Sequence, residues 1–427
     1  MKRLASRLWR RLPGGAFARN VLVIAGGSTL GQLLAVAASP LLTRLYAPEQ
    51  FGVLGVYMAS IALLSGVATL RYELAIPLPK DDATAKRLLQ LALGLSLGFA
   101  LTLALVLLWF GSTLLGWLGW DELIPYTAFL PLGTFLIASY QSLTYWAVRS
   151  GQYRAIATTK LWQGVGNVAT QIALGLVGAG ALGLLAGDAV GRSAGITRLA
   201  RGAPGLFRLP DVRALLDAAR RYRKFPIWST GSTFINRFGL QLPQLFMATA
   251  FGPREAGWYL LTQRVLGTPT SLVGQAVAQV FLNRIAEIRR EEPQRAPAFY
   301  LGIVGRMALV GGLPILVLGV ALGGAFGWLF GEEWSTAGRM VQILAPMFAA
   351  QWTFSPTSQI LVVFERQELQ LVWDVLRLAL LGSALAYARW VGVDALGATA
   401  AISAAMTFAY LVLGVMNYCS TKWVLKT

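Results

Sequence analysis

Residues 27–57 read GSTLGQLLAVAASPLLTRLYAPEQFGVLGVY, and their pattern returns about 204 residues later, with Gly231 opposite Gly27. The motif Gly27-Ser28-Thr29-Leu30 reappears as Gly231-Ser232-Thr233-Phe234, and the turn 46–52 is echoed by 251–257. Each copy is a long apolar segment, a short Pro-x-x-x-Gly turn and a second long apolar segment. Two matches at nearly one offset predict a duplicated helical hairpin that heads two similar halves. A chance match of short patterns is the alternative.

The composition predicts an all-α polytopic membrane protein. Of the 427 residues, 56% are hydrophobic and 13% are charged, whereas a soluble protein carries about a quarter charged residues. Segments of alternating hydrophobicity, which are typical of an outer-membrane barrel, do not occur. Long uncharged runs each exceed the roughly 20 residues that cross a bilayer as a helix; they include 20–43, 50–70, 88–120, 123–148, 340–364 and 395–421.

Several kinds of chemistry are excluded by the residue types that are missing. The chain has no histidine, which removes imidazole acid–base catalysis and imidazole metal sites. Its single cysteine, Cys419, cannot form an internal disulfide or a thiolate metal cluster. We therefore expect no catalytic residue, no metal and no cofactor. The net charge of +18 is clustered in a way that indicates membrane topology rather than nucleic-acid binding.

Twelve transmembrane spans account for the apolar segments. The fifth and sixth are divided only by the segment 178–180, which reads GAG. Outside the spans and at their ends, 26 Lys and Arg residues fall on the side of the N-terminus and four on the opposite side. The positive-inside rule therefore predicts that both termini are cytoplasmic. The spans lie at about 20–43, 51–76, 88–110, 123–147, 156–178, 181–200, 226–250, 257–282, 299–322, 340–363, 369–389 and 395–418.

The basic segments also mark the predicted domains. The linker contains a stripe of Leu215, Leu216, Ala219 and Tyr222, which predicts a helix lying on the inner leaflet. A cleaved signal peptide is the competing interpretation of the N-terminus. The domains are a basic interfacial segment 1–19, a six-helix lobe 20–200, a basic amphipathic cytoplasmic linker 201–225, a six-helix lobe 226–420 and a cytoplasmic tail 421–427.

Two arginines within predicted spans are the strongest candidates for function. Each would cost about 2.5–3.5 kcal/mol if it faced lipid at the bilayer centre. Neither Arg237 nor Arg264 has an acidic residue at i±3 or i±4 on its own helix. We therefore expect both to face a wet cavity or an anionic partner.

Other charges within the spans have local explanations. Asp188 with Arg192, and Asp374 with Arg377, have the spacing of intrahelical ion pairs. Arg71 and Glu73 are two residues apart and would not share a helical face, which predicts different partners for them. For Arg71, a functional role and snorkelling to the membrane surface both remain open.

Polar side chains recur at helical spacing beside these arginines. Interhelical hydrogen bonds, worth about 0.6 kcal/mol each, are the structural explanation; a hydrogen-bonding cavity for a hydroxyl-rich anion is the functional one. The stripes are Ser28, Gln32, Ser39 and Thr43; Gln163, Asn167 and Gln171; Thr233, Arg237, Gln241 and Gln244; and Arg264, Thr268, Ser271, Gln275 and Gln279. The candidate substrate-binding residues are Arg237, Arg264, Arg71, Gln32, Asn167, Gln241 and Gln275.

Four segments in order carry a family resemblance: LLTRLYAPEQFG at 41–52, RYELAIPLPK at 71–80, RYRKFP at 221–226 and QRVLGTP at 263–269. Together they resemble Wzx-type O-antigen and polysaccharide flippases. The resemblance implies the multidrug/oligosaccharidyl-lipid/polysaccharide exporter fold, with two six-helix lobes around a central cavity. It also implies the bacterial inner membrane and an undecaprenyl-pyrophosphate-linked oligosaccharide, an O-antigen or a capsule or exopolysaccharide repeat unit, as substrate.

The resulting functional hypothesis is a flippase that works by alternating access. Membrane lipids are expected partners, and a polysaccharide polymerase and other assembly proteins are further candidate partners. A cation-coupled multidrug antiporter of the same superfamily is one alternative; it would need unpaired buried carboxylates, for which Glu73 and Asp188 are the candidates. A membrane polysaccharide polymerase or ligase is another alternative, although all the predicted outward loops are short.

Overall fold

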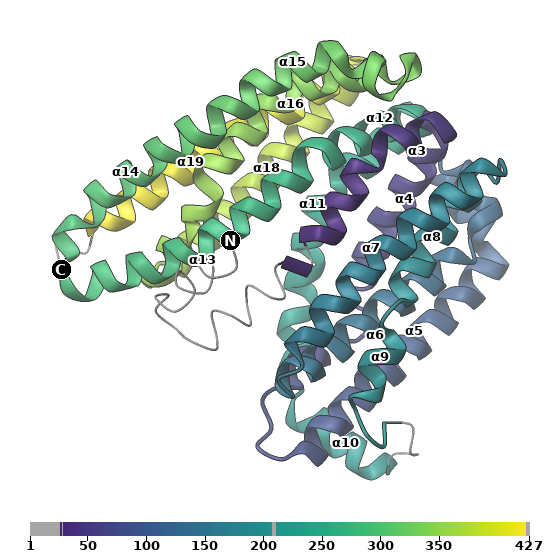
Figure 1. The fold of residues 1–427 in the computed structure, drawn as a ribbon. Helices are drawn as coiled ribbons and strands as arrows, with labels where there is room; N and C mark the ends of the chain where they lie inside the picture. The colour runs from purple at the N-terminus through teal and green to yellow at the C-terminus, as the bar shows by residue number, and fades with distance from the viewer. Residues whose placement is uncertain (1–25, 28, 207–210, 424–427) are drawn as a thin grey trace, which may run out of the picture. The chain divides into compact units, whose positions relative to one another are not determined.

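The computed structural model describes residues 26–27, 29–206 and 211–423, and every regular element among these residues is helical (Figure 1). The predicted interfacial segment 1–19 lies outside the described residues. Within them the chain divides into two compact units. Unit 1 comprises the residues up to 38 together with 57–116 and 123–238, and unit 2 comprises 39–56, 117–122 and 239–427.

Unit 1 holds the polar residues of the first half of the chain. Helix α4 (Pro48–Leu64) enters it from unit 2 at Tyr57, and α11 (Thr230–Phe251) leaves it after Phe238. The other elements are a helical stretch 29–37, η1 (Tyr72–Ala75), α5 (Asp82–Trp117), α6 (Phe129–Arg149), α7 (Tyr153–Leu176), α8 (Ala181–Ser193), α9 (Ile196–Arg201), α10 (Val212–Arg221) and η3 (Phe225–Ser229).

Unit 2 holds the second half and the first turn of the repeat. Trp334 is its largest fully buried side chain; its indole donates to the carbonyl of Thr43 at 3.1 Å and its ring meets Phe51 edge-on. Its α-helices and π-helical turns are α3 (Ser39–Leu45), α12 (Pro253–Thr262), η4 (Gln263–Gly267), α13 (Thr268–Glu291), α14 (Ala296–Met307), η6 (Ala308–Gly312), α15 (Leu313–Phe330), α16 (Ser335–Phe354), α17 (Gln359–Val363), α18 (Gln367–Val391) and α19 (Ala395–Trp423).

These units do not follow chain order, because residues 39–56 pack with the second half of the chain. The division into lobes 20–200 and 226–420, with the linker 201–225, stays a prediction. The predicted break between the fifth and sixth spans is confirmed. Helix α7 ends at Leu176 and α8 begins at Ala181, with Gly178 and Gly180 at φ angles of 71° and 60° between them.

Six described helical segments are long and apolar enough to cross a membrane, so the count of twelve spans is not confirmed. The first predicted span, 20–43, lies partly outside the described residues, and the other five coincide with helices that are shorter or more polar. For example, α8 has 13 residues, and α7 carries the stripe of Gln163, Asn167 and Gln171. The six segments are Pro48–Ala68, Asp82–Trp117, Pro253–Glu291, Pro293–Phe330, Gln367–Val391 and Ala395–Lys422.

The two copies of the repeated turn pack against each other in unit 2. A Cβ atom at Gly52 would lie 1.8 Å from the carbonyl oxygen of Pro253, and one at Gly257 would lie 1.9 Å from that of Pro48. The contact is reciprocal, since each glycine faces the proline of the other copy. Both glycines are thus required by a backbone-to-backbone approach, and the repeated motif has a structural role.

We expect Gly52→Ala to lower the thermal stability of the detergent-solubilised protein. The added methyl group would meet backbone atoms that cannot rotate away, and overpacking of this kind costs about 1–3 kcal/mol. Gly98→Ala on α5 is the matched control, because nothing lies within 4 Å of the added Cβ atom. Equal melting temperatures for the two variants would contradict the close packing of the turns.

Candidate functional site

An arginine cluster, defined here as Arg71, Glu73 and Arg237, lies in unit 1. Helix α4 ends at Leu64, and the chain then makes turns in which Leu70 and Arg71 have φ angles of 48° and 63°. Positive φ is uncommon for residues other than glycine and costs of order 1–3 kcal/mol. Arg71 is therefore held in a backbone conformation that the surrounding contacts must maintain.

The left-handed conformation turns Arg71 back onto its neighbour. Its Nη1 atom donates to Oε1 of Glu73 at 2.9 Å. The prediction of different partners for these two residues is wrong, because it assumed that the helix continues through them. The structure instead places Arg71 before the short 3-10 helix η1.

Glu73 is the buried anion of the cluster. Its side chain is 1% exposed, and its carboxylate accepts hydrogen bonds from Arg71 and from the hydroxyl of Thr69. A buried carboxylate is tolerated only when it is paired and hydrogen-bonded. The Nε atom of Arg71 is also buried, with no hydrogen-bond partner among the described residues.

Arg237 reaches the same region from α11. Its Nη1 atom donates to the carbonyl of Ala62 at 2.6 Å and to the hydroxyl of Ser65 at 2.8 Å. Gly66 makes room for the side chain, since a Cβ there would lie 3.0 Å from Cδ of Arg237. The guanidinium thus caps the negative end of the α4 dipole.

The cluster carries one net positive charge from two guanidinium groups and one carboxylate. Arg71, Glu73 and Tyr145 all lie within electrostatic range of Arg237. The direct hydrogen bonds of Arg237 go to a carbonyl and a hydroxyl. Unit 1 therefore concentrates cationic donors beside a single carboxylate that is already paired with Arg71, which suits an additional anion.

The remaining arginine candidate belongs to the other unit. Arg264 lies in the π-helical turn η4, between α12 and α13, and is half-buried. Neither unit by itself brings Arg71, Arg237 and Arg264 together. Gln241 and Gln275 also belong to unit 2, where Gln241 is half-buried on α11 and Gln275 is exposed on α13.

Asn167 and Gln32 have different surroundings. Asn167 packs against α8. A Cβ atom added at Gly191 would lie 2.8 Å from the Cβ atom of Asn167. Gln171, one turn later, donates to the carbonyl of Leu184 at 3.1 Å. The structure thus favours interhelical packing for this stripe. Gln32 is exposed on the helical stretch 29–37.

A second polar cluster in unit 1 contains the predicted ion pair of Asp188 and Arg192. The pair is confirmed, with Nε of Arg192 at 2.5 Å from Oδ2 of Asp188. Tyr57 donates to the same oxygen at 3.0 Å, a contact that the sequence did not reveal. The predicted pair of Asp374 and Arg377 is also confirmed, at 3.5 Å.

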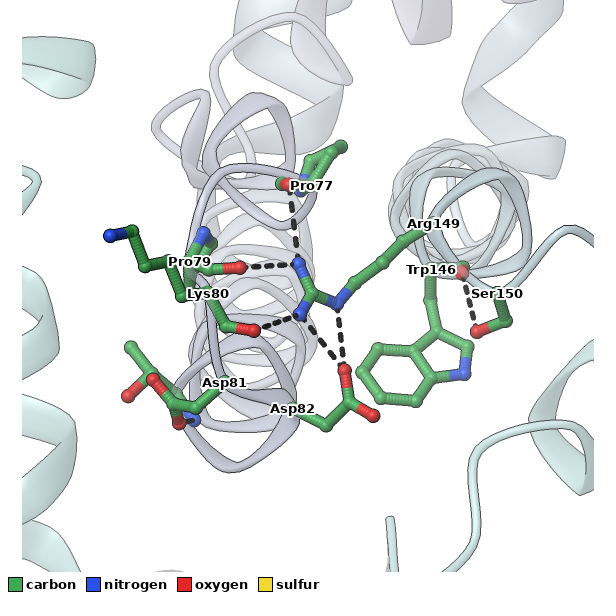
Figure 2. Close-up of polar contacts among 9 residues, drawn as sticks. Pro77, Pro79, Lys80, Asp81, Asp82, Trp146, Arg149 and Ser150 are labelled. Carbon is green, nitrogen blue, oxygen red and sulfur yellow. Dashed lines mark hydrogen bonds and ion pairs between the residues drawn. The ribbon is translucent and has the colours of Figure 1, made fainter.

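Arg149 was missed as a structural residue by sequence reasoning, although it holds the loop that follows η1. From the end of α6 it donates to the carbonyl of Pro79 at 2.6 Å and to the carboxylate of Asp82 at 2.9 Å (Figure 2). Further hydrogen bonds go to the carbonyls of Pro77 and Lys80. Nothing local in the sequence pairs position 149 with residues about 70 positions earlier.

Comparison with known proteins gives two curated relatives. The chain is 24% identical over 216 residues to "Teichuronic acid biosynthesis protein TuaB" of Bacillus subtilis (strain 168), covering 50% of this chain and 42% of that protein. It is 23% identical over 173 residues to "Lipopolysaccharide biosynthesis protein WzxC" of Escherichia coli (strain K12), covering 39% and 34%. The matched part thus spans less than half the length of these relatives.

Solved structures show the fold. A multidrug resistance MATE family transporter of the MOP superfamily, in an inward-facing conformation, has a TM-score of 0.70 at 16% identity, with 96% of both chains covered. The lipid II flippase MurJ, in an inward closed conformation, has a TM-score of 0.69 at 10% identity, covering 95% of this chain and 88% of MurJ. The predicted all-α polytopic fold is confirmed by these likenesses. The polysaccharide biosynthesis protein family model matches residues 41–338, more than half of the chain, and the protein therefore belongs to that family.

Proposed function

We propose that this protein is a flippase that moves an undecaprenyl-pyrophosphate-linked oligosaccharide across the bacterial inner membrane by alternating access. The proposed cargo is an O-antigen or a capsule or exopolysaccharide repeat unit. The family match over 41–338 supports the link to polysaccharide assembly, and the fold is one that MATE transporters and MurJ also have. In this proposal the chain is a transporter and not an enzyme.

The arginine cluster is the observation that carries the proposal. A pyrophosphate has many acceptor oxygens, and guanidinium groups match such oxygens bidentately. Arg71 and Arg237 supply two guanidiniums against the single carboxylate of Glu73. A site with a net positive charge suits an anionic carrier lipid and disfavours a cationic drug.

The proposal assigns roles to the other candidates. Arg264, in unit 2, would hold a phosphate or an acidic sugar of the cargo. Gln32, Gln241 and Gln275 would contact sugar hydroxyls, because amide groups both donate and accept hydrogen bonds. Asn167 would contribute through the packing of α7 on α8.

Topology and partners belong to the same proposal. Both termini would be cytoplasmic, and a polysaccharide polymerase and other assembly proteins would receive the translocated repeat unit. Drug–cation antiport is the second transporter class to compare. The carboxylates it would use, Glu73 and Asp188, are each paired with an arginine.

Reconstitution into lipid vesicles tests the function directly. The purified chain should move a fluorescent undecaprenyl-pyrophosphate oligosaccharide to the opposite leaflet, where an added glycosidase can reach it. A cationic dye should not be transported under the same conditions. Dye transport without movement of the oligosaccharide lipid would overturn the proposal in favour of the antiporter.

A further inference from the structure

Helix α10 has one face that is fixed to unit 1. Its N-terminus is capped by Asp211, whose carboxylate accepts from the backbone N–H of Arg213 at 3.0 Å. Ala218 is buried in a cluster formed with the ends of α5 and α6, and Ala219 and Tyr222 pack against that cluster. In Figure 1, α10 lies at the end of unit 1 that also holds α9.

The outward face of α10 combines positive charge with exposed apolar side chains. Arg213, Arg220 and Arg221 are exposed, while Val212 is 67% and Leu216 is 51% exposed. Helical spacing predicts that Leu216 shares a stripe with Leu215, whereas in the structure Leu216 is exposed and Leu215 is half-buried. Exposed apolar side chains beside arginines are typical of helices that lie in the interface of an anionic bilayer.

The apolar edge continues into η3. Ile227 is 62% and Trp228 is 75% exposed, and Arg223 and Lys224 lie just before them. Tryptophan prefers the headgroup level of a bilayer. The charge of this surface and its apolar edge together match anionic lipid headgroups.

A hydrogen bond connects α10 to Tyr72, the residue between Arg71 and Glu73 of the arginine cluster. The hydroxyl of Tyr72 donates to the carbonyl of Ala219 at 3.0 Å. Tyr72 is 6% exposed and lies between Arg71 and Glu73 in the chain. Tyr72 and Ala218 belong to the same buried cluster. A displacement of α10 would therefore act directly on the turn that positions Arg71.

We propose that α10 binds the anionic lipid headgroups of the membrane surface and that the Tyr72–Ala219 hydrogen bond transmits this contact to Arg71 and Glu73. Arg71 has a strained backbone, which persists only while its surroundings hold it. A lipid that binds one position of α10 more tightly shifts the protein toward that position. Anionic lipid thereby keeps the arginine cluster assembled. The consequence for transport rests on the proposed function, whereas the transmission itself does not.

Two labelled proteins test the proposal without any transport assay. In a Cys419→Ser background, a cysteine replaces either Leu216 on α10 or Leu78, which is 58% exposed after η1. Each cysteine carries an environment-sensitive fluorophore, and the proteins are placed in phosphatidylcholine vesicles with or without phosphatidylglycerol. We expect phosphatidylglycerol to shift the emission of both labels.

Two further substitutions separate lipid binding from transmission. Tyr72→Phe keeps the ring but lacks the hydroxyl, so the label at position 216 should still respond and the label at 78 should not. Arg213→Gln with Arg220→Gln should abolish both responses. The charge-matched control, Arg284→Gln with Arg290→Gln on α13, should leave both unchanged.

Three outcomes would overturn the proposal. In the first, the emission of the label at 216 does not change with phosphatidylglycerol. In the second, it changes only with an added acidic polypeptide. In the third, the emission of the label at 78 shifts as much in Tyr72→Phe as in the wild type. Thermal unfolding shows whether each variant is folded. A wild-type chain that responds at both labels but moves no lipid-linked oligosaccharide would refute the proposed function and leave this inference intact.

Discussion

Arg237→Ala should reduce transport of lipid-linked oligosaccharide by about ten- to a hundred-fold. A hydrogen bond to a charged group is worth about 1.5–3 kcal/mol, and each 1.4 kcal/mol is a factor of ten. Removing the guanidinium also leaves one positive and one negative charge in the arginine cluster, which abolishes its net charge. The measurement is leaflet-to-leaflet movement in vesicles, normalised to the amount of folded protein.

Three variants separate anion binding from the capping of α4. Ser65→Ala removes one acceptor of Arg237 and keeps the guanidinium, so transport should remain near that of the wild type. Arg237→Lys keeps the charge and loses the planar fork, so an intermediate rate is expected. Arg306→Ala removes an exposed arginine on α14 and should have no effect. Equal losses in Ser65→Ala and Arg237→Ala would show that Arg237 acts only as a helix cap.

Glu73→Ala should be the most destabilising single substitution in the arginine cluster, by about 3–5 kcal/mol. Removing one partner of a buried ion pair leaves the other charge uncompensated. The resulting loss of folding free energy exceeds the net contribution of the intact pair to stability. Here the remaining Arg71 is 17% exposed and faces a second arginine within electrostatic range. Thermal or denaturant unfolding in detergent measures the loss.

A double-mutant cycle tests the cause of that loss. Arg71→Ala in the Glu73→Ala background removes the uncompensated charge and should recover part of the stability. Glu292→Ala removes an acid from the exposed pair with Arg295 and should change the stability by less than about 1 kcal/mol. If Glu73→Ala unfolds at the wild-type temperature, the buried pair does not stabilise unit 1.

Part of the candidate site follows from local sequence, because local spacing decides it. Asp188 and Arg192 are four residues apart, and on any helix that spacing brings their side chains together. The same reasoning failed for Arg71 and Glu73. It assumed that the helix continues through them, whereas α4 ends at Leu64. Ser65 and Gly66 follow the last residue of α4, but they do not predict that Leu70 and Arg71 adopt positive φ despite their side chains.

The sequence by itself determined that the chain is all-helical and crosses the membrane repeatedly. In lipid, long uncharged runs can satisfy their backbone hydrogen bonds only as helices. Glycines mark the break between two of these helices at 178–180. Only the tertiary structure decided which distant groups meet. Arg237 donates a hydrogen bond to the end of α4, about 175 positions earlier, and Gly257 packs against the backbone of Pro48. Such contacts depend on how the helices pack, and neither helical periodicity nor residue spacing records that packing.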